Sequence, residues 1–337
     1  MISVIHVGPG VYSFGGTQTV IRVIRDHKMG ADDIRVLSTW EGRHHVKNFV
    51  LTARAAAVLA RAPRTTIVHF HISDGGAWLR EGPLIRLAKA RGLRIVATLQ
   101  GADVAREALR HRRYIGATLR RADHLIVFSE DARAAVAELA PRVPSTISVN
   151  PAPIDWDAPG AGTTPPVALF AGTVGLRKGV DTLAAAWQLL LDEGIEGQCR
   201  VVGPIDDYTP PQLERFSVEP AVHPDAIPEL IRSARVVVLP SRAEAMPLIV
   251  TEALAGARPA VATPVAGTPG IVPDPKMLVP VDDPPALAAA IGRYLRDPEL
   301  AERDGLKGQA HIAATRSPDV IGAELRRIYE SLGVGAD

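Results

Sequence analysis

The segment 234–262, ARVVVLPSRAEAMPLIVTEALAGARPAVA, constrains the fold more strongly than any other part of the chain. Its start at 236–239 is apolar and β-branched, which is typical of a strand buried on both faces. Pro247 favours the first position of a helix and Gly256 the residue just past its end, so we predict a helix between them. The uncharged run 259–263 predicts a second buried strand. A strand, a helix and a strand in this order predict a parallel α/β sheet.

The same alternation of strands and helices runs through both halves of the chain. In the first half we predict strands at 3–7, 34–38, 66–71, 94–99 and 124–129, and helices at 17–26, 47–61, 84–91 and 131–139. In the second half we predict strands at 167–171, 199–203, 236–239 and 260–263, a weaker strand at 218–222 that Pro220 interrupts, and helices at 180–191, 228–233 and 247–255. Two such series predict two doubly wound parallel sheets.

A boundary between two domains is expected near Pro153. The stretch 150–166 holds five prolines and two glycines, which is typical of a linker. Residues 1–153 carry 22 lysines and arginines against 12 aspartates and glutamates, whereas the rest of the chain is acidic and the net charge is only +1. We therefore predict one domain over 1–153 and a second over 154–315, and we expect the basic domain to face an anionic partner.

Two glutamates flank the loop and the helix of the segment 234–262. Glu244 lies at the carboxyl end of the predicted strand, where ligands of open α/β sheets bind, and Glu252 lies in the helix. The backbone that opens the helix, and that can bind phosphate or sugar oxygens, belongs to Ala245, Met246, Pro247 and Leu248. A carboxylate accepts two hydrogen bonds at once, so Glu252 can bind the ribose diol and Glu244 the hydroxyls of a hexose. Spacing alone equally allows two solvated surface glutamates.

The whole string resembles the donor-site signature of glycosyltransferase family 4, the retaining enzymes with the GT-B fold. The matching residues are Pro240, Ser241, Glu244, Glu252, Ala253, Gly256 and Pro259. One detail departs from the family pattern, because the glycine stands one position early. The resemblance implies two Rossmann-like domains that face a cleft, with a C-terminal helix at about 316–337 that crosses back to the first domain.

A second motif, AGTVGLRKG at 171–179, also follows a strand and precedes a helix. Lys178 and Arg177 can neutralise a diphosphate, and the glycines let the backbone approach it. The family has a Gly-Arg and then a Lys-Gly in this place, so Lys178 matches, whereas the family's arginine falls on Thr173. Arg177 can supply the missing charge. The alternative is a basic surface turn.

The first half carries two further parts of the resemblance. Gly15 and Gly16 match the family's glycine pair, which lets a loop pass close to the donor phosphates. Gln100 and Asp103 fall where the family has His-Gly-x-Asp on the sugar or acceptor side. Glutamine can form hydrogen bonds but carries no proton at neutral pH. For Gln100 and Asp103, the alternative is that they are ordinary polar residues of a loop.

We expect no metal site. His69 and His71 lie on one strand without a carboxylate or cysteine at ligand spacing, which favours packing. The Asp155-Trp156-Asp157 motif lies in the linker and follows no clear strand. The glycines of Gly8-Pro9-Gly10 form only part of a dinucleotide-binding fingerprint.

Composition bears on the location of the protein. No apolar run approaches the length of about 18 residues that a membrane span requires. The single cysteine, Cys199, fits a reducing compartment, so we expect a cytoplasmic protein. The stretch 104–121 holds six arginines and one glutamate, and it is either a solvated helix face or a surface for anionic lipid at the inner face of the membrane.

The resemblance implies a retaining, metal-independent hexosyltransferase that uses a UDP- or GDP-sugar and needs no cofactor. A hexose would move to a hydroxyl acceptor, which can be lipid-linked, in polysaccharide, glycolipid or glycoside biosynthesis. Lys178, with Arg177, would stabilise charge on the leaving diphosphate, and Glu244 would orient the sugar. No nucleic-acid partner is expected. Two other classes stay open, a GT-B sugar-nucleotide epimerase and a nonenzymatic nucleotide- or carbohydrate-binding module.

Overall fold

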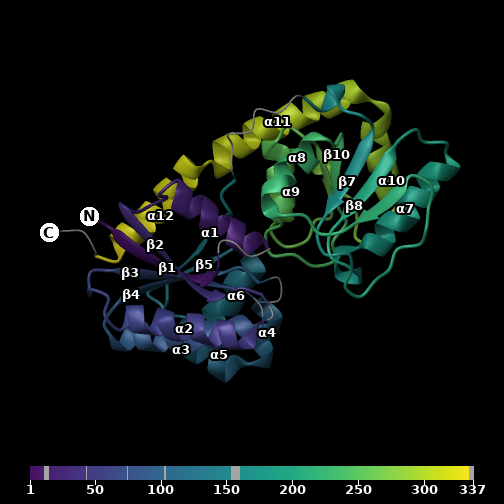
Figure 1. Ribbon diagram of the computed structural model, residues 1–337. Coiled ribbons are helices and arrows are strands. Elements are labelled where there is room, and N and C mark those ends of the chain that lie inside the picture. The colour runs from purple at the N-terminus through teal and green to yellow at the C-terminus, as the bar shows by residue number, and fades with distance from the viewer. Residues whose placement is uncertain (11–14, 43, 74, 102–103, 153–159, 334–337) are drawn as a thin grey trace. The chain divides into compact units, whose positions relative to one another are not determined.

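The computed structural model describes residues 1–10, 15–42, 44–73, 75–101, 104–152 and 160–333. The chain divides into two compact units, each built on its own parallel sheet (Figure 1). Unit 1 consists of Met1–Pro151 together with Pro318–Asp337, and unit 2 consists of Ala152–Ser317. No helix in these described ranges combines the length and the apolar character that a bilayer span requires.

Unit 1 contains a six-stranded sheet in the order β2-β1-β3-β4-β5-β6, and every described strand pair is parallel. Its strands are β1 (Ser3–Pro9), β2 (Asp33–Trp40), β3 (Ile67–Ile72), β4 (Arg94–Leu99), β5 (His124–Val127) and β6 (Ser145–Ile147). The short edge strand β6 was not predicted, because three half-buried residues give no periodic signal. The carboxyl ends of the other strands form the edge at which sequence analysis expects ligands.

Helices cover both faces of this sheet. They are α1 (Gly16–Asp26), α2 (His45–Leu59), α3 (Gly76–Ala90), α4 (Val104–Arg110), α5 (Arg112–Leu119), α6 (Glu130–Leu139) and α12 (Pro318–Ser331). Figure 1 shows α1 and α12 on one side of the sheet and α2, α3 and α5 on the other. The C-terminal helix α12 is anchored to unit 1, where Tyr329 Oη lies 2.7 Å from His69 Nδ1.

Two predicted helices of unit 1 have different bounds in the structure. The helix predicted at 84–91 begins earlier, at Gly76, and continues through Pro83 to Ala90. Pro83 has no N–H to donate to the carbonyl oxygen of Leu79, four residues earlier, and Leu79 is exposed to water. The basic stretch 104–121 is not one helix. His111 leaves the helical region (φ −123°, ψ 37°), and α5 restarts in a direction that buries Ile115.

Unit 2 contains a five-stranded parallel sheet in the order β11-β10-β7-β8-β9. Its strands are β7 (Val167–Ala171), β8 (Gln198–Val202), β9 (Phe216–Glu219), β10 (Val236–Leu239) and β11 (Ala260–Ala262). Its α-helices are α7 (Val180–Asp192), α8 (Ile227–Arg232), α9 (Leu248–Ala255), α10 (Pro284–Arg296) and α11 (Pro298–Arg316). The weak strand predicted at 218–222 ends before Pro220. Pro247 caps α9 rather than beginning it, with an extended backbone (φ −70°, ψ 111°).

A buried acid lies near the carboxyl edge of the sheet in unit 1. Glu81 of α3 is fully buried, and its Oε1 lies 2.5 Å from Thr39 Oγ1, which also lies 3.1 Å from the Gly8 carbonyl oxygen. A hydroxyl has one proton, so Thr39 can donate to only one of these two acceptors. A protonated Glu81 satisfies both contacts, because it donates to Thr39, which then donates to Gly8. Burial raises the pKa of Glu81 to about 7, although the charge of Arg80 partly opposes this.

This buried acid predicts a pH dependence for the stability of unit 1. The pKa of Glu81 is about 7 in the folded state and near 4.5 in the unfolded state. Between pH 4.5 and pH 7 the folded protein therefore keeps the Glu81 proton, whereas the unfolded chain has lost it. The contribution of Glu81 to the free energy of unfolding should therefore fall by about 3 kcal/mol as pH rises from 4.5 to 7, and stay constant above 7. Glu81→Gln should remove this fall.

The measurement is hydrogen exchange in urea, read on peptides of β1 and β3 at pH 5 and pH 8. The wild-type curve must be compared with that of the variant, because the buried histidines His6, His69 and His71 have lowered pKa values in the folded state and make stability rise with pH up to about 6.5. Glu138→Gln, at an exposed glutamate, is the control. Equal pH dependence of wild type and Glu81→Gln would show that Glu81 is ionised in the folded state.

Candidate donor-binding site

The loop after β10 is held in place by hydrogen bonds that end on Glu244. The Thr263 hydroxyl, just past β11, donates to the Ser241 carbonyl oxygen. The Ser241 hydroxyl then donates to Glu244 Oε1 over 2.7 Å. Glu244 is only 8% exposed, so contacts within the protein, rather than contacts with water, fix the position of its side chain. A carboxylate is thus fixed just beyond the carboxyl end of a central strand.

Lys178 reaches the same carboxylate from the neighbouring strand. It ends the 3₁₀ turn Leu176–Lys178 after β7, and β7 pairs with β10 in the sheet. Its Nζ lies 2.5 Å from Glu244 Oε1, and the two side chains are 17% and 9% exposed. The predicted cation and the predicted sugar-binding carboxylate therefore meet at the carboxyl edge, where a diphosphate and a sugar could lie side by side.

Gly179 makes this meeting of the two loops possible. Its backbone is left-handed (φ 68°), and a Cβ at this position would lie 1.9 Å from the Pro240 carbonyl oxygen. Only glycine combines that conformation with that approach. In the Lys178-Gly179 pair predicted from the sequence, the glycine therefore lets the two loops approach each other, and the lysine side chain then reaches Glu244.

Arg177 also contacts the Glu244 loop, although through the backbone. Its Nη1 donates to the Ala243 carbonyl oxygen over 2.9 Å, and the Arg242 N–H donates to the Arg177 carbonyl oxygen. Arg177 is exposed, whereas Thr173, at the family's arginine position, is half-buried. In this arrangement the guanidinium of Arg177 supports the loop that carries Glu244.

Residues 245–248 and Glu252 follow Glu244 in the sequence. Glu252 is on α9 and is 9% exposed. The Ala245 carbonyl oxygen accepts a hydrogen bond from Gly267 N over 3.1 Å, and Met246 is buried. Pro247 and Leu248 begin the helix, as its cap and its first residue.

Two arginines that sequence reasoning did not select support this site. Arg242 pairs with Asp181 through two contacts of 2.7 Å and with Asp282 through one. These carboxylates raise the pKa of Arg242, and Arg242 lowers that of Asp181. Arg242 therefore ties the loop after β10 to the start of α7. Its place between Ser241 and Glu244 in the motif was the signal that could have identified it.

The second arginine, Arg316, ends α11 and is 1% exposed. Its Nη2 donates to the Gly270 carbonyl oxygen over 2.6 Å, and its Nη1 lies 3.7 Å from Met246 Sδ. Burial lowers its pKa to about 10. Nothing in the sequence connects Arg316 with Met246, because 70 positions separate them.

The structure places the described candidates of unit 1 at its carboxyl edge. Gly15 precedes α1 with a positive φ of 141°, and Gly16 is the first residue of the helix. Gln100 follows β4 directly, and its Nε2 lies 3.1 Å from His71 Nδ1. Asp103 lies outside the described residues, as do Asp155 and Asp157.

His69 and His71 belong to a buried cluster with His6. One ring nitrogen from each of the three lies within 4.8 Å of the others. His69 contacts Tyr329 Oη at 2.7 Å and Thr98 Oγ1 at 2.6 Å, while His71 contacts His6 and Gln100. Both ring nitrogens of His69 and His71 are therefore engaged within the protein. Burial lowers the pKa of all three histidines, so they are neutral at pH 7.

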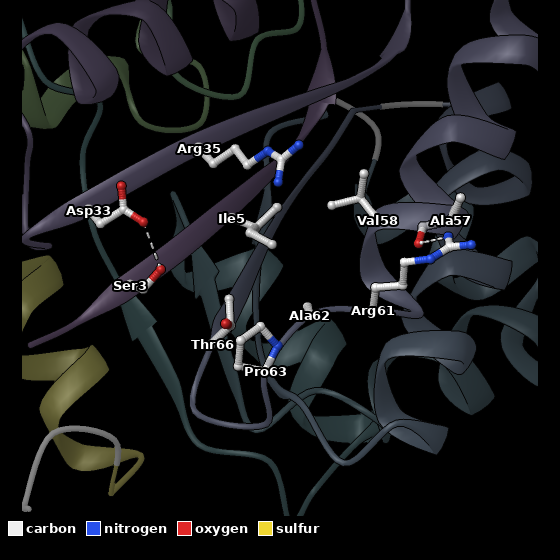
Figure 2. Close-up of a pocket in the computed structure, with 10 residues that line it drawn as sticks. All are labelled: Ser3, Ile5, Asp33, Arg35, Ala57, Val58, Arg61, Ala62, Pro63 and Thr66. Carbon is white, nitrogen blue, oxygen red and sulfur yellow. Dashed lines mark hydrogen bonds between the residues drawn. The ribbon is translucent and has the colours of Figure 1, made fainter.

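A cavity of about 450 Å³ lies at the opposite end of unit 1 (Figure 2). Its lining comes from the starts of β1, β2 and β3 and from the end of α2 and the residues after it, and includes Ser3, Asp33, Arg35, Arg61 and Thr66. This is the amino edge of the sheet, whereas ligands of such sheets bind at the carboxyl edge. None of the candidate residues named above lines it.

Comparison with known protein families gives a match within unit 2. Residues 165–297 match the family model described as "Glycosyl transferases group 1". This match lies within unit 2 and covers less than half of the chain. The matched range includes Lys178, Glu244 and Glu252, but stops short of Arg316.

Curated relatives and solved structures extend this result. Alpha-D-kanosaminyltransferase of Streptomyces kanamyceticus is 30% identical over 50% of this chain and 46% of its own. D-inositol 3-phosphate glycosyltransferase of Streptomyces griseus subsp. griseus is 30% identical over 63% of this chain and 54% of its own. The chain thus spans about half the length of the curated relatives it matches.

Two solved structures share the fold of nearly the whole chain. Sucrose-phosphate synthase from Thermosynechococcus elongatus is 19% identical, with a TM-score of 0.76 over 99% of this chain and 100% of its own. Anabaena HepE in complex with UDP-glucose is 13% identical, with a TM-score of 0.75 over 98% of this chain and 100% of its own. These likenesses confirm the predicted GT-B fold, with two parallel-sheet α/β domains.

The close approach at Gly179 predicts a position-specific cost of adding a methyl group. Gly179→Ala should lose about 2–5 kcal/mol of stability, because it combines a strained φ with a collision against Pro240. Gly194→Ala is the matched control, since Gly194 also has a positive φ (71°) but has no atom within 4 Å of the added Cβ. It should lose only about 1–2 kcal/mol. Urea denaturation measures both, and equal losses would contradict the role of the Pro240 contact.

Proposed function

We propose that the protein is a retaining glycosyltransferase of family 4 that transfers a hexose from a UDP- or GDP-sugar to a hydroxyl acceptor. The observation that carries the proposal is the Lys178–Glu244 pair at the carboxyl edge of two neighbouring strands. HepE, whose fold is similar, was solved with UDP-glucose, and the relatives are named as glycosyltransferases. A product in polysaccharide, glycolipid or glycoside biosynthesis fits this class.

In the proposed reaction, each residue has a role that follows from its position. Lys178 stabilises the charge that develops on the leaving diphosphate, and its effect grows in the transition state because that charge grows. Glu244, already fixed by Ser241, accepts hydrogen bonds from the hexose hydroxyls. Glu252 binds the ribose diol, and Arg177 supports the Glu244 loop through Ala243.

The retaining and metal-independent features belong to the same proposal. The acceptor hydroxyl attacks from the face that the diphosphate leaves, and a leaving phosphate oxygen accepts its proton. Lys178 and the loop amides that follow β7 and β10 neutralise the diphosphate by charge and by hydrogen bonds.

The test is nucleotide binding followed by product analysis. We expect calorimetry to detect binding of UDP, GDP or ADP, with one base preferred. Glu252→Ala and Lys178→Ala should each weaken the binding of that nucleotide by about 1.5–3 kcal/mol, because each removes a charged hydrogen-bond partner. Arg177→Ala should weaken it less, because the Arg177 guanidinium donates to the Ala243 carbonyl oxygen of the loop.

The control is Arg200→Ala, which removes an ion pair with Glu219 on neighbouring strands of unit 2. It should leave nucleotide affinity unchanged. Unchanged affinity in a folded Glu252→Ala protein would contradict the assignment of Glu252 to the ribose.

Incubation with the preferred sugar nucleotide but no acceptor then separates the alternative functions, since an epimerised donor would identify an isomerase. An unchanged donor that also stays unchanged with every acceptor would identify a binding module.

We further propose that unit 1 contacts an anionic membrane peripherally, where a lipid-linked acceptor would lie. Large apolar side chains are exposed near the starts of α2 and α3 and in α4. They are Val46, Phe49 and Val50 on α2, Leu79 on α3 and Leu109 on α4. Because these helices follow β2, β3 and β4, their starts lie at the carboxyl edge of one sheet. Exposed arginines of α4 and α5 can attract anionic headgroups.

Cosedimentation with vesicles of mixed neutral and anionic lipid tests this contact. We expect binding at low salt that weakens at high salt, because the attraction between the basic unit and the headgroups is screened. Phe49→Asp should reduce binding, since Phe49 is 75% exposed. Leu306→Asp, at an exposed leucine of unit 2, should not. Absence of binding at low salt would leave the arginines as a solvated face.

A further inference from the structure

The cavity at the amino edge of unit 1 lies between two paired strands and the end of α2 (Figure 2). Ser3 and Ile5 of β1 stand beside Asp33 and Arg35 of β2. Because alternate side chains of a strand point to the same face of a sheet, these four side chains share the face toward α2. On the helix side, none of the apolar side chains is larger than valine, and they are Ala57, Val58, Ala62 and Pro63. These small side chains leave a space of about 450 Å³.

The cavity has a buried floor and a charged rim. The floor is mostly apolar and consists of the buried lining residues Ile5, Ala62 and Thr66. The charged lining residues are exposed and form the rim, and they are Asp33, Arg35 and Arg61. Small-molecule sites combine apolar walls with a few polar groups that fix the orientation of the ligand. This arrangement therefore suits a ligand with an apolar body and one charged group.

The charge of Arg35 is available to such a ligand. Its guanidinium has no hydrogen-bond or ion-pair partner among the described residues, whereas Arg61 Nη1 donates to the Ala57 carbonyl oxygen over 2.9 Å. Asp33 Oδ2 accepts a hydrogen bond from Ser3 Oγ over 3.0 Å. Figure 2 shows the Arg35 side chain extending from β2 toward α2. A guanidinium binds a carboxylate through two parallel hydrogen bonds, which fixes the carboxylate in one orientation.

The charges of the rim favour an anion with a single charge. Two guanidinium groups and one carboxylate give the lining a net charge of +1. A bound carboxylate would neutralise this charge, whereas a phosphate dianion would leave an excess negative charge near Asp33. The volume of the cavity also lies within the range of about 300–1,000 Å³ that is usual for small-molecule sites.

We propose that this cavity binds a small carboxylic acid with a short apolar chain, with the carboxylate on Arg35 and the chain over the floor. The site lies within unit 1, at the amino edge of its sheet, whereas Gly15 and Gln100 lie at the carboxyl edge. It is therefore a ligand site additional to the candidate site for the donor. The inference does not rest on the proposed glycosyl transfer.

The first test is a titration of the whole chain with hexanoate, followed by methyl NMR. We expect saturable shifts of the methyl signals of Ile5 and Val58, and no shift for Ile115, which is buried on α5. Acetate lacks the chain and hexanol lacks the charge, so each should bind at least about tenfold more weakly than hexanoate. Shifts that do not saturate, or equal affinity for all three compounds, would overturn the proposal. Tighter binding of hexyl phosphate than of hexanoate would overturn the assignment to carboxylates.

The second test removes the charge at the rim. Arg35→Gln should weaken hexanoate binding by about tenfold, the value of one charge-assisted hydrogen bond. Arg94→Gln is the matched control, because Arg94 is also exposed and begins β4 at the same amino edge, but does not line the cavity. It should leave the affinity unchanged. Equal losses in both variants would indicate general attraction to a basic surface and would overturn the contact with Arg35.

The third test fills the cavity without changing its charge. Ala57→Leu places a larger side chain in the lining from an exposed position of α2, and should weaken hexanoate binding by at least about tenfold. Ala53→Leu is the control, since Ala53 is exposed one turn earlier in α2 and lies outside the lining. It should bind hexanoate as the wild type does. Unchanged affinity in Ala57→Leu would show that hexanoate binds elsewhere and would overturn the proposal.

Discussion

The approach of the loop after β7 to the loop after β10 is the constraint on which the candidate site depends. Gly179 lies so close to the Pro240 carbonyl oxygen that no side chain fits between them. This approach brings Lys178 Nζ within 2.5 Å of Glu244 and lets Arg177 reach the Ala243 carbonyl oxygen. Because β7 and β10 are neighbours in a parallel sheet, their loops emerge at the same edge, and the glycine decides how near they come.

Two arginines, the half-buried Arg242 and the buried Arg316, support this edge in unit 2. Arg242 bridges Asp181 and Asp282, so the loop before Glu244 is fixed to the start of α7. Arg316 contacts the Met246 thioether from the end of α11, and burial lowers its pKa. A buried cation is costly unless its N–H groups are hydrogen-bonded, and Arg316 Nε has no partner among the described residues, so the bond from Nη2 to the Gly270 carbonyl oxygen is important. Rigid support of this kind is what a binding site needs to hold its ligand in one geometry.

Unit 1 uses neutral polar groups in the corresponding place. The three histidines stack across β1 and β3, and Glu81, Thr39 and Gly8 form a second buried network near the same edge. Buried polar groups are costly unless they are hydrogen-bonded, so such networks fix the positions of their members.

The sequence alone determined the parallel α/β architecture, because buried strands are apolar and β-branched and helices between them carry proline and glycine signals at their ends. It also selected Lys178, Glu244 and Glu252, since a motif places them at fixed distances along the chain. The sequence did not separate α4 from α5 or extend α3 through Pro83, because those bounds follow from which side chains become buried. Only the tertiary structure brought Arg316 to Met246, joined His6 to Gln100 through His71, and directed Arg177 to a backbone carbonyl. These contacts join residues on different strands and helices, and their geometry depends on strand order, which local patterns do not encode.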